Sequence, residues 1–320
     1  MRGADYVVKR TIFAIATVFV AISLNFVLFR TLPGDAVSNL ARVPRATPEL
    51  RQALTREFGL DKPKWEQYVL YLRELTHLNL GVSYANQQPV WANLRNKLWN
   101  TIPMATLGTG LAILLGMATG VVSAWRRGTL TDHLSTNTAI AFYAVPTQWL
   151  GLMLLILFAG VLPANGMSDP YLFNPTMLAK TLDILRHMIL PSATLALTLY
   201  GEYTLIVRSS MLETLGEDYV LTARAKGLSS WNVVRRHALR NAMLPTTTLI
   251  ALSLGYIVAG TILIETVFSW PGIGQAVFKA VADRDYPMLQ GAFLVLTLSV
   301  VLFNFAADLL YFKLDPRIST

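Results

Sequence analysis

Residues that could do chemistry are few and widely separated in this sequence. There is no cysteine, which excludes thiol catalysis, cysteine metal sites and disulfides. The sequence has no Gly-x-x-x-x-Gly-Lys-Ser/Thr, His-Glu-x-x-His or Gly-x-Ser-x-Gly motif. The histidines fall in or beside four different loops, so their spacing predicts no metal cluster: His77, His133, His187 and His237. We therefore expect no catalytic residues and no cofactor or metal in this chain.

Five polar residues stand inside or at the edge of long apolar stretches: Asn25, Gln148, Glu202, Asn304 and Asp308. Ionisable groups in such surroundings are costly and commonly face a water-filled path or a partner. Glu202 could line a water-filled pathway, with Tyr200 and Tyr203 beside it as further lining residues. Alternatively, Glu202 pairs with Arg208 or with a partner subunit, and the tyrosines are simple anchors. Asp308, at the inner edge of the last apolar stretch, is expected to be an interface residue.

The elements that must position these residues are membrane-spanning helices. The chain of 320 residues is 53% hydrophobic and only 14% charged, whereas a soluble domain has roughly 25% charged residues. A bilayer crossing needs about 20 residues. Six windows approach or exceed that length without Asp, Glu, Lys or Arg, and the fourth extends past Glu202 to about Val207: 11–29, 101–124, 134–162, 187–201, 241–264 and 286–307. We predict an all-α membrane protein with six transmembrane helices.

The distribution of Lys and Arg predicts that both termini are cytoplasmic, because cytoplasmic loops carry the excess of positive charge. The first window could instead be a signal peptide, but RTLPGD follows it rather than a cleavage site of small residues. The predicted organisation is therefore a cytoplasmic N-terminus, a first span, an extracytoplasmic helical segment, a core of five spans and a cytoplasmic C-terminus: 1–10, 11–30, 31–100, 101–312 and 313–320. Topology and lipid headgroups account for the net charge of +8 without nucleic acid.

Several local patterns predict how these elements are shaped. In the extracytoplasmic segment, one short helix is expected over 47–59, and a second places Trp65, Val69 and Leu72 on one face. Gly116 and Gly120 have the small-xxx-small spacing that permits close helix packing, although glycine is also common in membrane helices by chance. Pro146 is expected to bend the third span.

The basic segment 208–243 predicts two helices separated by Gly227, a natural left-handed helix terminator. Leu212, Leu215, Tyr219 and Ala223 recur at helical spacing before this glycine. After it, Ser229 or Ser230 can cap a helix with an apolar side and an arginine side: Trp231, Val234 and Ala238, and Arg235, Arg236 and Arg240. The segment could be a plain interfacial loop, a DNA-binding helix-turn-helix, or a docking element whose small residues, Ala223, Ala225 and Gly227, permit close contact with a partner.

A second irregular block, ETVFSWPGIGQ, follows the fifth window. Pro271, Gly272 and Gly274 force a turn, and irregular backbone at membrane depth needs protein or water around it. This block could be an ordinary tight loop with an interfacial tryptophan.

The stretch TARAKGLSSWNVVRRHALRNAMLP resembles the "EAA" loop of bacterial ABC importer permeases, in the variant found in dipeptide and oligopeptide importers. RTLPGDAV, LNLGVSYANQQPV, ETVFSWPGIGQAV and DLLYFKLDPRI occur in the matching order, so the chain resembles the B-type permease subunit over its whole length. The glutamate that names the loop is replaced by Leu221-Thr222-Ala223, and the proline falls late, at Pro245. Both departures are usual in the peptide subfamily.

This resemblance implies a type I ABC importer permease fold in the bacterial inner membrane. It implies a heterodimer with a second permease, two cytoplasmic ATPase subunits that bind ATP and Mg, and an extracytoplasmic substrate-binding protein that delivers peptide. It assigns ATPase coupling to Asp218, Tyr219, Ala223, Arg224, Ala225, Lys226, Gly227 and Leu228. It assigns an outer gate or re-entrant loop to Glu265, Phe268, Trp270, Pro271, Gly272 and Gly274.

Three other functions are carried as alternatives. Nickel-chelate importer permeases resemble the peptide permeases at this level. A self-contained channel or secondary transporter would not need a docking helix and often shows internal repeats, which are not evident here. A membrane enzyme would need a catalytic constellation that the sequence lacks.

Overall fold

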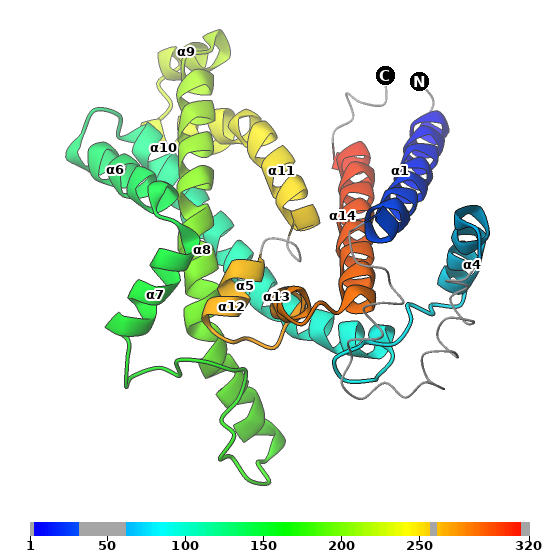
Figure 1. The fold of residues 1–320 in the computed structure, drawn as a ribbon. Coiled ribbons are helices and arrows are strands. Elements are labelled where there is room, and N and C mark those ends of the chain that lie inside the picture. Colours follow the sequence, from blue (N-terminus) through cyan, green and yellow to red (C-terminus); the bar gives the residue numbers. More distant parts are fainter. Residues whose placement is uncertain (1–2, 32–61, 257–260, 315–320) are drawn as a thin grey trace. The chain divides into compact units, whose positions relative to one another are not determined.

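The computed structural model describes residues 3–31, 62–256 and 261–314, which are mainly helical (Figure 1). Within these ranges the only β feature is an isolated antiparallel bridge between Val82 and Pro89. The chain divides into two compact units, a terminal unit of residues 1–101 and 271–320 and a central unit of residues 102–270. The all-α prediction is confirmed.

In the terminal unit, α1 (Gly3–Thr31) packs along α14 (Tyr286–Leu314). Asn25 donates a hydrogen bond from Nδ2 to the Gln290 carbonyl at 3.2 Å. The Arg10 guanidinium lies 3.1 Å from the Asp308 carboxylate. Asp308 is thus paired inside the chain and partly exposed, and its role as an interface residue stays a prediction.

The helix predicted around Trp65 is present as α4 (Lys64–Thr76), but a different face packs. Trp65 and Val69 are 68% and 57% exposed. Tyr68 and Tyr71 instead place their rings 5.2 and 5.5 Å from that of Phe26 in α1. Tyrosine, with an apolar ring and a polar hydroxyl, can pack and still hydrogen-bond. The helix predicted over 47–59 lies outside the described residues.

A buried carboxylate fixes the loop that leads into α5 (Val90–Trp125). Asp285 precedes α14 and is 2% exposed. It accepts hydrogen bonds from the Ser83 hydroxyl at 2.5 Å and from the backbone N–H groups of Tyr84 and Ala85 at 3.1 and 3.2 Å. It also accepts one from the Met288 N–H at 3.2 Å, which caps α14. One side chain thus joins two segments that are about 200 residues apart in the sequence.

The central unit is built around α8 (Met177–Leu215), which packs closely on α5. A Cβ on Gly116 would overlap the Cβ of Tyr203, and a Cβ on Gly120 would lie 2.8 Å from the Thr204 carbonyl. The predicted close helix packing at these glycines is confirmed, and its partner is a helix of the same chain. The Ser192 hydroxyl adds a 3.1 Å hydrogen bond to the Met104 carbonyl.

The third apolar window is broken into α6 (Leu130–Ala144) and α7 (Thr147–Leu157). The two helices meet at an angle of 105°. Val145 is extended (φ −77°, ψ 127°), as expected before a proline, and Pro146 is the N-cap residue of α7. The predicted bend at Pro146 is confirmed, and it separates two helices.

The rest of the central unit comprises α9 (Asp218–Ala225), α10 (Ser230–Asn232), the π-helix η1 (Val233–Ala238), α11 (Leu239–Tyr256) and α12 (Ile262–Val267). The terminal unit also contains α13 (Ile273–Ala282). Four described helices are long and apolar enough to cross a membrane, or five spans if α6 and α7 count as one. The fifth predicted window includes residues 257–260, outside the described part, so the six-span count stays a prediction.

Candidate functional site

The predicted docking helix is present as α9, at one end of α8 (Figure 1). It is closed by Gly227, whose φ of +76° lies in the left-handed region that favours glycine. The Gly227 N–H donates to the Arg224 carbonyl at 2.9 Å, and the Leu228 N–H to the Ala223 carbonyl at 3.4 Å. The prediction that this glycine terminates the helix is confirmed.

The inner face of α9 packs into a buried cluster, here called the loop core. Its buried members come from five elements: Ala124 of α5; Val207 and Met211 of α8; Val220 and Ala223 of α9; Val233, Val234 and Ala238 of η1; and Ala242 of α11. Ala223 is only 4% exposed. It therefore contacts its own chain, and the expectation that it meets a partner is wrong.

The outer face of α9 and the following turn are exposed. Their exposed side chains are Asp218, Tyr219, Leu221, Thr222, Arg224, Ala225, Lys226 and Leu228. Tyr219 accepts at its hydroxyl a 2.7 Å hydrogen bond from Nδ2 of Asn241, which ties this face to α11. Every predicted coupling residue except Ala223 is thus available to a partner. The coupling role itself stays a prediction.

The second helix of the basic segment is less regular than predicted. Ser229 stands at the start of α10, but without a side-chain capping hydrogen bond, and after three residues the backbone becomes π-helical. Val234 and Ala238 are buried as expected, whereas Trp231 is 46% exposed. A π-helical turn contains an extra residue, which shifts the helical register and turns Trp231 off the buried side.

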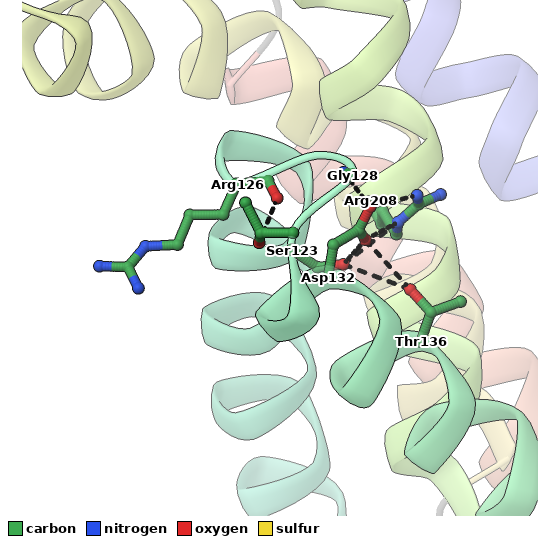
Figure 2. Close-up of polar contacts among 7 residues, drawn as sticks. Ser123, Arg126, Gly128, Asp132, Thr136 and Arg208 are labelled. Carbon is green, nitrogen blue, oxygen red and sulfur yellow. Dashed lines mark hydrogen bonds and ion pairs between the residues drawn. The ribbon is translucent and has the colours of Figure 1, made fainter.

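A polar cluster beside the loop core joins three helices (Figure 2). Arg208 of α8 donates from Nε to Oδ1 of Asp132 at 2.7 Å and from Nη2 to Oδ2 at 3.0 Å. The Asp132 carboxylate also accepts hydrogen bonds from the Ser123 hydroxyl at 2.5 Å and from the Gly128 N–H at 2.9 Å. Both side chains are largely buried, with 4% of Asp132 and 25% of Arg208 exposed.

This ion pair ties the α5–α6 turn to α8. Arg208 lies between Val207 and Met211, which both belong to the loop core that holds α9. A displacement of α9 therefore has a contiguous packed route through α8 to the start of α6. Sequence reasoning missed Asp132, and the only available signal was an isolated carboxylate beside the uncharged window 134–162.

The predicted pathway residues are close in sequence but differ in their surroundings. Tyr203 is fully buried and donates from its hydroxyl to Oγ of Ser253 at 2.7 Å. Tyr200 is also buried, with its ring edge-on to Phe142 at 6.2 Å. Glu202 is half-buried and forms no ion pair with any described residue.

These contacts bear on the alternatives that the sequence left open. The proposed pairing of Glu202 with Arg208 is wrong, because the guanidinium belongs to Asp132. The structural roles of Tyr200 and Tyr203 are explained by packing, and a pathway role for Glu202 stays a prediction.

The predicted gate residues divide between the two units. In the central unit, Glu265, Phe268 and Trp270 are all buried. The Thr261 hydroxyl donates to the Glu265 carboxylate at 2.9 Å, and the Gly166 N–H donates to the Phe268 carbonyl at 2.9 Å. These two aromatic residues are core side chains in this structure, and their function as an apolar plug stays a prediction.

The other three gate residues belong to the terminal unit and lead into α13: Pro271, Gly272 and Gly274. Asn100 and Thr101 of α5 hold this turn. The Pro271 carbonyl accepts a 2.9 Å hydrogen bond from Nδ2 of Asn100, and the Thr101 hydroxyl accepts one of 3.0 Å from the Ile273 N–H. Side chains thus satisfy two backbone groups of this irregular turn, and its position at membrane depth stays a prediction.

Comparison with known proteins identifies relatives over almost the whole chain. The family described as "Binding-protein-dependent transport system inner membrane component" matches residues 112–320, and its N-terminal companion family matches residues 4–105. The dipeptide transport system permease protein DppB of Escherichia coli (strain K12) is 37% identical over 98% of each chain.

Two further relatives carry related names. The di/tripeptide transport system permease protein DppB of Pseudomonas aeruginosa (strain UCBPP-PA14) is 37% identical, again over 98% of each chain. The glutathione transport system permease protein GsiC of Escherichia coli O6:H1 is 33% identical over the same share. With its apolar spanning helices, the chain therefore belongs to the inner-membrane permease family of binding-protein-dependent ABC transport systems.

Proposed function

We propose that this chain forms, with a second permease subunit, the transmembrane path of an importer for dipeptides and oligopeptides. An extracytoplasmic binding protein delivers the substrate, and two cytoplasmic ATPase subunits bind ATP and Mg and supply the energy. The names of the three relatives support a peptide cargo. The absence of a phosphate-binding loop in the sequence supports separate ATPase subunits.

The exposed face of α9 carries the proposal that an ATPase docks here. Ala225 and Gly227 are exposed and small, and a Cβ built on Gly227 meets no atom of the chain within 4 Å. Arg224 and Lys226 beside them supply positive charge for complementary carboxylates. Val220 on the opposite face is fully buried in the loop core, so pressure on the exposed face acts on packed side chains.

The route inward explains how docking moves the membrane helices. Val220 contacts a cluster that includes Val207 and Met211 of α8. Arg208, on the same stretch, reaches Asp132 at the start of α6. Because packed interiors are stiff, a rigid-body shift of α9 moves α8 and the α5–α6 turn together.

The docking proposal is tested in the assembled complex with Ala225→Trp and Gly227→Val. Bulk at either position should reduce ATPase co-purification and substrate-stimulated hydrolysis, while the chain remains inserted. Gly160→Val is the matched control, because Gly160 also has a positive φ (+78°) and open space around it. Gly227→Asn separates strain from bulk, since asparagine tolerates the left-handed conformation. Normal docking and stimulation in both bulky variants would refute the proposal.

The cargo is tested separately by uptake into vesicles that contain the complete transporter. Labelled dipeptide should accumulate in an ATP-dependent manner, and a nickel chelate should not compete. Uptake of the nickel chelate without dipeptide uptake would refute the peptide assignment and leave the docking proposal intact.

A further inference from the structure

Two exposed tryptophans contact each other where α5 ends, with their ring planes tilted by 46°. Trp125 is the last residue of α5, and its ring centroid lies 5.2 Å from that of Trp231 in α10. Their exposed fractions are 37% and 46%. Tryptophan concentrates at membrane–water boundaries because its ring is apolar and its N–H is polar. Since α5 is an apolar spanning helix and Arg126 and Arg127 follow it at once, the pair marks the headgroup level.

Five exposed arginines follow the two tryptophans in the sequence. Two come directly after Trp125 and three come within nine residues after Trp231: Arg126 and Arg127, and Arg235, Arg236 and Arg240. Among the residues that the structure describes, none of their guanidinium groups forms an ion pair with a carboxylate. The Arg126 guanidinium lies 5.7 Å from the Trp125 ring centroid. Figure 2 shows its side chain pointing away from the Asp132–Arg208 cluster. These charges are therefore available to a ligand outside the chain.

The backbone holds the second group of arginines beside Trp231. Arg235 and Arg236 stand four and five positions after this tryptophan, on the π-helical turn of η1. Val233 and Val234, on the same turn, are 1% and 2% exposed in the loop core. Their burial fixes the rotation of the turn, so Arg235 and Arg236 lie on its exposed side, one helical turn after Trp231.

We propose that Trp125, Trp231 and the five arginines form a Trp–Arg surface that binds the headgroup of an anionic phospholipid. A guanidinium group matches phosphate oxygens with parallel N–H donors, and basic side chains near a membrane attract anionic lipids. The indole pair at the end of a spanning helix supplies the apolar contact for the glycerol and upper acyl chain. This position at the boundary selects lipid as the occupant, whereas the exposed face of α9, before Gly227, is left to the ATPase.

The test uses the full chain reconstituted in phosphatidylcholine vesicles that contain either brominated phosphatidylglycerol or brominated phosphatidylcholine. Bromine quenches nearby tryptophan fluorescence, and a chain with Trp125→Phe and Trp231→Phe gives the background of the other five tryptophans. Native chain should be quenched at a lower mole fraction of the brominated anionic lipid. The selectivity is the ratio of the mole fractions of the two brominated lipids that give equal quenching. One basic residue near an anionic surface contributes about 1 kcal/mol, a factor of about five. Removing three arginines (R235Q, R236Q and R240Q) should therefore reduce the selectivity at least about fivefold.

A matched control removes three exposed basic residues of the terminal unit (K64Q, R73Q and R95Q) and should keep the selectivity. A second variant, Arg126→Gln with Arg127→Gln, tests the same surface at the end of α5. This variant should lose the selectivity for the anionic lipid. Unaltered quenching by brominated phosphatidylcholine shows that each variant is inserted. Native selectivity in both arginine variants would overturn the proposal. Native selectivity together with lost ATPase co-purification would also overturn it and assign the surface to a protein partner.

Discussion

Removing the charge of Asp132 should destabilise the central unit strongly. Its two carboxylate oxygens accept four hydrogen bonds of 3.0 Å or less, two of them from Arg208. In Asp132→Asn the introduced amide keeps one acceptor oxygen and turns an N–H₂ group toward donors. The guanidinium of Arg208, three-quarters buried, then has no counter-charge. Breaking a buried pair on one side costs about 3–5 kcal/mol, so the folded-to-unfolded ratio should fall by a factor of about 150 or more.

The measurement is unfolding of the purified full chain by sodium dodecyl sulfate in mixed micelles, followed by circular dichroism. Asp132→Asn and Arg208→Met should each lower the free energy of unfolding by about 3–5 kcal/mol. The double variant should lose less than their sum, by about 2 kcal/mol or more, because it leaves no unpaired buried charge. Thr136→Val is the control, since its bond to the same carboxylate is 3.3 Å long and weak. It should cost less than about 1 kcal/mol.

Single variants that each lower the free energy of unfolding by less than about 1 kcal/mol, with additive effects in the double variant, would contradict a buried, strongly coupled pair. That result is typical of a solvent-exposed pair, whose charges are screened by water. The Asp132–Arg208 pair would then be too weak to transmit a displacement of α9 through α8 to α6.

Three further predictions follow from the packing and the sequence. Gly116→Val should prevent folding of the central unit, because the added Cβ overlaps Tyr203. Gly110→Val should be tolerated, because a Cβ at that position meets no atom within 4 Å. Thermal unfolding of both variants tests this difference. Asp285→Asn should cost about 1–3 kcal/mol and should make the loop around Ser83 susceptible to proteolysis at sites that the native chain protects. The isolated chain should bind no ATP in equilibrium dialysis, and micromolar, salt-resistant binding would contradict the assignment of ATP hydrolysis to separate subunits.

Features governed by neighbouring residues were predictable from the sequence. Pro146 lacks an N–H and restricts the residue before it, so a break in the third window followed from local geometry. Gly227 was identified as a helix terminator for a similarly local reason, and its positive φ confirms it. Gly116 and Gly120 predicted close packing because their spacing alone places both on one helix face.

Features that depend on distant partners were not predictable from one sequence. Asp132 and Arg208 are 76 positions apart, and Glu202 was an equally reasonable partner for the arginine by proximity in the chain. Asp285 was missed altogether, because a carboxylate that binds backbone N–H groups leaves no sequence pattern in the loop that it holds. The packing of Tyr68 and Tyr71 on Phe26 was not predicted either, because nothing local in the sequence links α4 to α1.

The break at Pro146 also has a consequence for biogenesis. At about 1.5 Å per residue, α6 and α7 are roughly 22 and 16 Å long, and each is shorter than the ~30 Å hydrocarbon layer. Both pack on α8, which follows them in the chain. At ~5–20 residues per second, the roughly 60 residues up to the end of α8 take about 3–12 s to synthesise. During that interval the two short helices lack their partner, so the translocon or a membrane chaperone must shelter the unpaired backbone groups at the break around Pro146 until α8 emerges.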